Sequence, residues 1–142
     1  MQVIKSQKRI PGGDRRSPRT RILLVDENAW DLDHYRRILH DCGFEVKPCA
    51  NFEEATRLLE AANFDCIVAS QGGPGFEGCT VLEHSVARDR FRPVVIICRH
   101  HDVACYLEAM QLGAVDYLEK PLTAPEIIRA VTTHIQPQHA AA

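Results

Sequence analysis

Residues 64–78, with the sequence FDCIVASQGGPGFEG, decide the fold of this chain. Residues 66–69 form a short apolar run without polar alternation, which is typical of a strand buried on both faces of a parallel sheet. The second half of the stretch contains four glycines and Pro74, so it can neither continue the strand nor begin a stable helix. Ser70 is therefore predicted at the carboxyl end of a central strand, where ligands commonly bind in open α/β sheets.

Strand and helix patterns alternate on both sides of this stretch. Apolar runs predict further strands at residues 22–25, 45–49, 94–98 and 115–118. Apolar residues at helical spacing predict helices at about 30–42, 51–62, 81–87, 102–112 and 123–135. Pro48 cannot donate to an interior ladder, so its strand is placed at a sheet edge. Five strands alternating with five helices predict a doubly wound parallel sheet.

The length and composition fit one domain with one core, since the chain has 142 residues, of which 45% are hydrophobic and 25% charged. No apolar run is long enough to span a membrane and no signal peptide begins the chain, so neither a membrane partner nor export is predicted. The six cysteines include no CxxC pair, and several lie in apolar runs where a thiol behaves as a small hydrophobic group. They are interpreted as reduced, in a cytoplasmic protein.

The two ends of the chain lack a hydrophobic period. Residues 1–20 are strongly basic and contain Pro-Gly-Gly and Ser-Pro, so they are predicted to be a disordered tail. Residues 136–142 are predicted to be a second disordered tail, which places the domain at 21–135 with no output domain after it. A basic arm is attracted to nucleic acid by charge, but a solvated extension is the preferred interpretation, and nucleic acid is not expected as a partner.

Polar residues follow the predicted strands at their carboxyl ends. Asp26 and Glu27 follow the first strand, Ser70 the third, Cys98 ends the fourth, and Lys120 follows the fifth. Because the carboxyl ends of parallel strands meet at one edge of a sheet, these side chains are expected to converge on one small polar pocket.

The four segments that carry these residues resemble the receiver domain of bacterial response regulators. They are ILLVDEN, FDCIVASQGGPGFEG, RPVVIICR and LGAVDYLEKPL, in the order and spacing of that family. The resemblance covers 21–135. It implies a flavodoxin-like sheet with strand order 2-1-3-4-5, helices on both faces, and a cytoplasmic, non-enzymatic role in two-component or phosphorelay signal transduction.

The resemblance also assigns expected roles to single residues. Asp26 and Glu27 match the family's acidic pair, which holds a magnesium ion. Lys120 matches the lysine that contacts the phosphoryl group, and Pro121 follows it in a bond that is commonly cis. Tyr117 matches the aromatic switch residue.

Two positions depart from the family pattern. Ser70 stands where the family has the aspartate that accepts the phosphoryl group, and Cys98 stands where it has a Ser or Thr, which is a stronger hydrogen-bond donor than a thiol. A serine hydroxyl needs a general base and gives a stable ester rather than a labile acyl phosphate. With one carboxylate fewer, magnesium is expected to bind Asp26 and Glu27 weakly at best, and no other cofactor is expected.

Three functions are compatible with this pattern. The preferred one is a pseudo-receiver without aspartyl phosphorylation, which binds a signalling protein, a histidine kinase or an output protein. Its binding face is expected at 102–112, 115–118 and 123–135, which is also the candidate homodimer face.

The second is a receiver regulated by a ligand in the pocket or by modification of Ser70. The third is a small enzyme that uses Cys98 with His100 or His101, which lacks an oriented third group. The acidic residues and Lys120 are also open to a purely structural interpretation, as an ion pair formed without metal.

Overall fold

The computed structural model describes residues 19–135, so the predicted tails lie almost entirely outside the described residues. The elements are β1 Arg21–Val25, α1 Ala29–Asp41, β2 Glu45–Cys49, α2 Phe52–Ala61, β3 Cys66–Ser70, α3 Cys79–Arg88, β4 Val94–Cys98, α4 Val103–Leu112, β5 Asp116–Glu119 and α5 Ala124–His134. All ten predicted elements are present. The largest difference is that α3 begins at Cys79, two residues earlier than its apolar pattern indicated.

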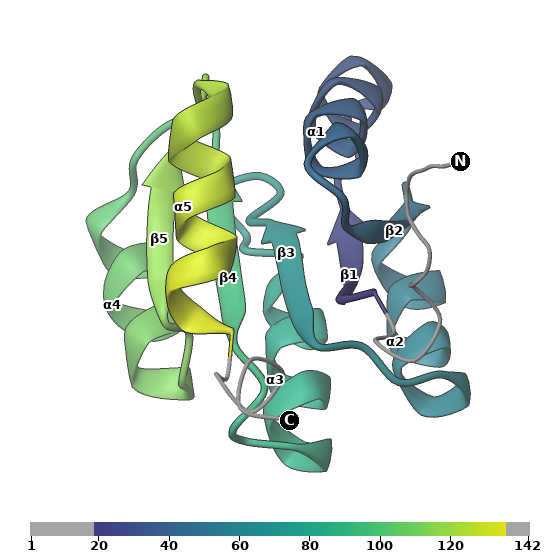
Figure 1. Ribbon diagram of the computed structural model, residues 1–142. Coiled ribbons are helices and arrows are strands. Elements are labelled where there is room, and N and C mark those ends of the chain that lie inside the picture. The colour runs from purple at the N-terminus through teal and green to yellow at the C-terminus, as the bar shows by residue number, and fades with distance from the viewer. Residues whose placement is uncertain (1–18, 136–142) are drawn as a thin grey trace, which may run out of the picture.

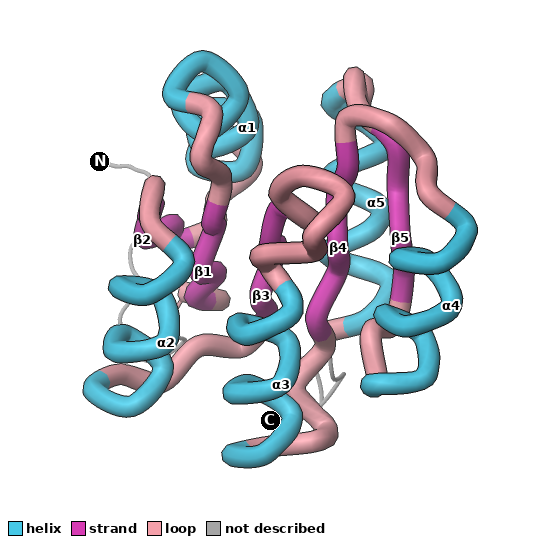
Figure 2. Tube along the Cα trace, turned by 180° about the vertical axis from the view of Figure 1, so that it is seen from behind, coloured by secondary structure: helices cyan, strands magenta, loops and turns pink. Residues whose placement is uncertain are grey.

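The strands form one parallel sheet in the order β2-β1-β3-β4-β5, which confirms the predicted topology. β2, which contains Pro48, is an edge strand. α1 and α5 cover one face of the sheet (Figure 1), and α2, α3 and α4 cover the other (Figure 2). No helix within residues 19–135 has the length and apolar character needed to cross a bilayer.

The core is divided by the sheet into two layers. Leu23 and Val25 of β1 point to the side of α2, α3 and α4, whereas Ile22 and Leu24 pack with α1 and α5. Every residue of β3 and β4 is buried, because helices cover both faces of these two interior strands. The continuous apolar runs of these strands therefore reflect two-sided burial.

Helix ends follow the capping signals of the sequence. Asn51 accepts a hydrogen bond from the backbone N–H of Glu54 at 2.8 Å, at the start of α2. Thr123 and Glu126 form a reciprocal capping box at the start of α5. Gly113 ends α4 in the left-handed region, with φ of +112°, a conformation that glycine adopts without a Cβ penalty.

Gly78, the residue immediately before α3, lies against the end of β3. The backbone N–H of Gly78 donates to the carbonyl oxygen of Gln71 at 2.9 Å. A Cβ at Gly78 would overlap the backbone carbonyl oxygen of Ser70. Only glycine therefore allows α3 to begin this close to the strand end.

We expect Gly78→Ala to lower the free energy of unfolding by about 2 kcal/mol or more, because backbone atoms must move to remove the overlap. Gly73→Ala is the matched control in the same turn, since a Cβ there meets its nearest neighbour, Glu77, at 3.8 Å. Its effect should stay within about 0.5 kcal/mol. Urea denaturation measures both, and equal losses would contradict this account of the turn.

Candidate functional site

The carboxyl ends of the strands meet at one edge of the sheet, which is the upper edge in Figure 1. Asp26 follows β1, Ser70 and Cys98 end β3 and β4, and Lys120 follows β5. Asp26, Ser70, Cys98 and Lys120 are buried. The sheet thus places the predicted residues along the same edge, as the alternating pattern required.

A buried ion pair joins the ends of β1 and β5. The Lys120 Nζ lies 2.8 Å from Asp26 Oδ2, and the two side chains are 5% and 0% exposed. The predicted ion pair of Lys120 is therefore present, with Asp26 as its partner. Glu27, the other candidate partner, is an exposed residue.

Asp31 is a second partner of Lys120 that sequence reasoning missed. Its Oδ2 lies 3.0 Å from Lys120 Nζ, and its side chain is 22% exposed. The signal in the sequence was an acid in the first helical turn, three residues after the N-cap Asn28. The apolar pattern of a helix does not indicate a carboxylate on its polar side, so Asp31 was not among the residues predicted for the pocket.

Hydrogen bonds between side-chain oxygens and backbone N–H groups fix the positions of the Asp26 and Asp31 carboxylates. Asp26 Oδ1 accepts from the backbone N–H of Asn28 at 2.9 Å, and Asn28 Oδ1 accepts from the backbone N–H of Asp31 at 3.0 Å. The backbone N–H of Asp26 in turn donates to the carbonyl of Cys49 on the neighbouring strand, at 3.0 Å. The start of α1 is thus fixed relative to the sheet.

Arg99 completes the network from the connection between β4 and α4. Its guanidinium forms an ion pair with Oδ2 of Asp31, the same oxygen that contacts Lys120, and its side chain is 53% exposed. The order Asp26, Lys120, Asp31, Arg99 therefore leads from fully buried side chains to one that is half exposed. It contains two carboxylates and two cationic groups.

Burial and ion pairing have opposing effects on the pKa of Asp26 and on the pKa of Lys120. Burial raises the pKa of the Asp26 carboxyl, and hydrogen bonds from Lys120 and from the Asn28 backbone only partly oppose this. Burial also acts to lower the pKa of Lys120, but its bonds to Asp26 and Asp31 outweigh burial and raise that pKa. The ammonium is thus held charged, and the Asp26 carboxylate depends on it.

Ser70 is engaged in the turn that follows it. Its Oγ accepts a hydrogen bond from the backbone N–H of Gly72 at 3.1 Å, and the residue is 2% exposed. In the described part of the chain, no carboxylate or imidazole contacts this hydroxyl at a distance suited to a general base.

Tyr117 lies in a buried position beside the pocket. Its hydroxyl donates to Oε1 of Gln71 and accepts from the backbone N–H of Asp102 at 3.2 Å. The rings of His101 and Tyr106 contact it edge-on, at centroid distances of 5.3 and 5.6 Å. Gln71, which directly follows Ser70 and is itself buried, therefore connects the β3 end to Tyr117, and the apolar patterns gave no sign of it.

Two further predictions concern the neighbouring residues. The peptide bond between Lys120 and Pro121 is cis, as expected. Cys98 is buried, and burial raises the pKa of its thiol. A thiolate is therefore disfavoured there, which weakens the case for Cys98 as a nucleophile.

The pocket does not fit the magnesium ion that the family resemblance implies. Magnesium requires oxygen ligands in octahedral geometry, commonly including carboxylates. Here Asp26 is held by Lys120 and by a backbone N–H, Ser70 offers a hydroxyl, and Glu27 is exposed. Two cationic groups already balance the two carboxylates of the network.

We expect Lys120→Met to lower the free energy of unfolding by about 3–5 kcal/mol, because it leaves the Asp26 carboxylate buried without a cation. Arg37→Ala, which removes an exposed ion pair with Asp33 of 2.9 Å, is the control and should cost about 1 kcal/mol or less. Urea denaturation measures both. Adding Asp26→Asn to Lys120→Met should recover part of the lost free energy of unfolding. If the losses of the two single variants simply add in the double variant, the Asp26 carboxylate does not depend on Lys120.

Comparison with known proteins gives one family. The model of the "Response regulator receiver domain" matches residues 22–132. The chain is 32% identical over 124 residues to the transcriptional regulatory protein FixJ of Bradyrhizobium diazoefficiens, covering 85% of this chain and 59% of that protein. It is 33% identical over 117 residues to the alginate biosynthesis transcriptional regulatory protein AlgB of Pseudomonas aeruginosa, covering 82% and 26%. The chain thus spans less than two thirds of these curated relatives.

Solved structures agree with this result. A receiver domain protein from Methanospirillum hungatei superposes with a TM-score of 0.80 at 22% identity, covering 88% of this chain and all of that one. Full-length FixJ from B. japonicum superposes with a TM-score of 0.74 at 30% identity, covering 86% and 60%.

Proposed function

The chain belongs to the family of response regulator receiver domains in two-component signalling, and we propose that it is an atypical member, a protein-interaction module that works without conventional aspartyl phosphorylation. The observation that carries this proposal is Ser70 at the carboxyl end of β3, on the same sheet edge as Lys120, whose charge is already balanced by Asp26 and Asp31.

The chemistry of phosphoryl transfer supports this proposal. A carboxylate is an ionised nucleophile at neutral pH, whereas a hydroxyl must lose a proton as it attacks. The Ser70 hydroxyl is buried and accepts a hydrogen bond from Gly72. The same burial argues against modification of Ser70 by a protein kinase, because the hydroxyl must enter the active site of the kinase.

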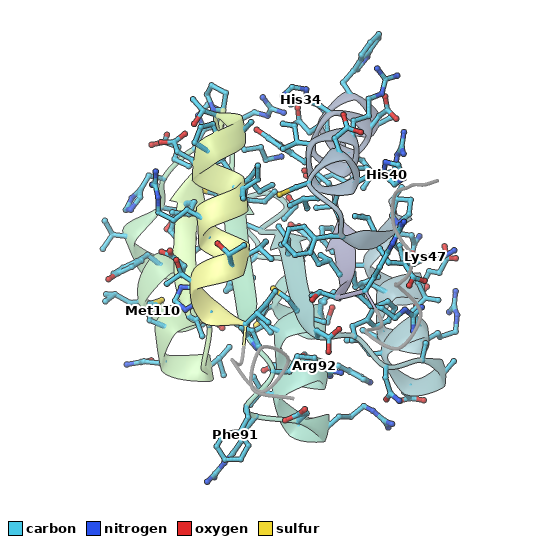
Figure 3. All side chains as sticks on the ribbon, in the orientation of Figure 1. His34, His40, Lys47, Phe91, Arg92 and Met110 are labelled. Carbon is cyan, nitrogen blue, oxygen red and sulfur yellow. The ribbon has the colours of Figure 1, made fainter. Side chains whose placement is uncertain are left out.

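The proposed binding surface is the face formed by α4, β5 and α5. Val103, Tyr106, Leu107 and Met110 are exposed on α4, at the spacing that places them on one side of a helix. Figure 3 shows Met110 at the edge of the molecule formed by α4. An exposed apolar stripe of this kind suits a protein partner, which we propose to be a signalling protein, a histidine kinase, an output protein or a second copy of this chain.

A ligand-regulated receiver is the second candidate. A hollow of about 160 Å³ lies between the turn after β3 and the turn after β4, lined by residues that include Gln71, Gly73, Arg99 and His100. Because Gln71 also binds Tyr117, a small molecule in this hollow would contact the same network. Among residues 19–135, only the lining of this hollow favours regulation by a ligand, so this function is the second candidate.

We expect the mass of the protein to stay unchanged after incubation with phosphoramidate and magnesium, because Ser70 lacks both an ionised carboxylate and a general base. Intact-protein mass spectrometry makes this measurement. A receiver that contains the aspartate is the positive control for the reagent. A gain of about 80 Da, labile to base, would show that an acyl phosphate forms on this chain, and the proposed function would then be wrong.

Where the partner is a second copy of this chain, we expect Leu107→Arg to abolish self-association, because a charge within the α4 stripe cannot be buried in an interface without a partner. Phe91→Arg is the matched control, since Phe91 is also exposed but projects from the lower end of the molecule in Figure 3, away from α4. Sedimentation velocity over a range of protein concentrations makes the comparison. Equal association of the two variants would exclude α4 as the homodimer face.

A further inference from the structure

We propose that Asp31 and Arg99 form an internal counter-ion pair that takes the place of both a carboxylate at Ser70 and a divalent cation. Through this pair Lys120 is held in place, and its charge is balanced, without ligand or metal. The inference deepens the proposed function and rests on it in one respect, that Ser70 is not a phosphoryl acceptor. It concerns which ions can bind beside Lys120, and it assigns a specificity-determining role to two residues, Asp31 and Arg99, for which the family resemblance gave no role.

Asp31 is positioned to supply the negative charge that Ser70 lacks. One oxygen, Oδ2, contacts both Lys120 at 3.0 Å and Arg99. The carboxylate lies in the first turn of α1, where the helix dipole favours an anion. Its position is fixed because Asn28, the N-cap, accepts a hydrogen bond from the Asp31 backbone and is itself bound by Asp26.

Arg99 connects two segments that are 68 residues apart in sequence. It ties the start of α1 to the connection between β4 and α4. Two backbone hydrogen bonds fix that connection further along. The N–H of His101 donates to the Glu119 carboxylate at 3.3 Å, and the N–H of Asp102 donates to the Tyr117 hydroxyl at 3.2 Å. The ion pair therefore fastens the loop that carries the contacts of Tyr117.

The charges of the network explain which ions are excluded. Asp26 and Asp31 are balanced by Lys120 and Arg99, so a divalent cation would enter a pocket with no charge left to neutralise it. A carboxylate restored at Ser70 would add one negative charge, but Arg99 would still oppose the cation. The exclusion of a cation is therefore set by Arg99 as well as by Ser70.

Magnesium titration of four proteins tests this proposal: the unaltered chain, Ser70→Asp, Ser70→Asp with Arg99→Ala, and Ser70→Asp with Arg90→Ala. Arg90 is the matched control, an exposed arginine in the connection between α3 and β4. Trp30, the single tryptophan, precedes Asp31 and is 86% exposed, so its fluorescence reports on this end of the sheet, with calorimetry as the second readout.

Relative to Ser70→Asp alone, adding Arg99→Ala should tighten magnesium binding about tenfold or more, because a repulsive charge is removed. Adding Arg90→Ala should change it by less than about twofold, because that charge is remote and screened. Equal effects of the two additions would overturn the role of Arg99.

A second measurement leaves Ser70 in place. Asp31→Asn should speed hydrogen exchange of the His101 and Asp102 amides about fivefold or more, because Arg99 then loses its counter-ion. Asp33→Asn is the control on the same helix, since among residues 19–135 Asp33 pairs with Arg36 and Arg37 and with no other cation. Unchanged exchange in Asp31→Asn would overturn the proposal.

The two proposals fail in different experiments. A phosphoryl adduct on the unaltered chain would overturn the proposed function. The magnesium series and the exchange rates decide on the counter-ion pair independently of that result, since neither uses a phosphoryl donor.

Discussion

The ion pair of Lys120 with Asp26 is the interaction on which the rest of the site depends. Lys120 follows β5 and Asp26 follows β1, and β3 and β4 lie between these two strands. The pair therefore spans the strand ends that carry Ser70 and Cys98. Burying either charge alone would cost several kcal/mol, whereas burying them together is close to neutral. Each residue thus requires the other, and together they fix the edge of the sheet where the family binds its ligands.

The position of Tyr117 is tied to the same edge by neutral hydrogen bonds. Gln71 leaves β3 with its backbone N–H bonded to Ile97 of β4, and its side chain bonds to both Tyr117 and the carbonyl of Gly73. Tyr117 in turn accepts from Asp102, the N-cap of α4. The start of α4 is thereby linked to the turn after Ser70. The pocket and the proposed binding face are thus parts of one connected structure, in which the phenolic ring is buried and partnered.

The sequence was sufficient for the fold and for part of the site, for reasons that differ between residues. The runs of β3 and β4 predicted interior strands because two-sided burial requires continuous apolar residues, and Pro48 placed β2 at the edge because it cannot donate. Lys120 was predicted to meet Asp26 or Glu27 because parallel strands align their carboxyl ends. Asp31, Arg99 and Gln71 were missed because their contacts depend on helix entry and loop direction, which no periodic pattern encodes.

Charge balance connects Ser70 with the residues that were missed. Ser70 carries a hydroxyl and no charge, and both anionic partners of Lys120 come from other elements, Asp26 after β1 and Asp31 from α1. Asp31 is nearer the solvent, and its second cation, Arg99, comes from the loop before α4. Under our proposal the ion pair of Asp31 with Arg99, which joins the start of α1 to the loop before α4, compensates for the uncharged side chain at the end of β3. Under the proposed function such a module is not phosphorylated at Ser70, and it signals through the occupancy of its α4 face rather than through a chemical change at the strand ends.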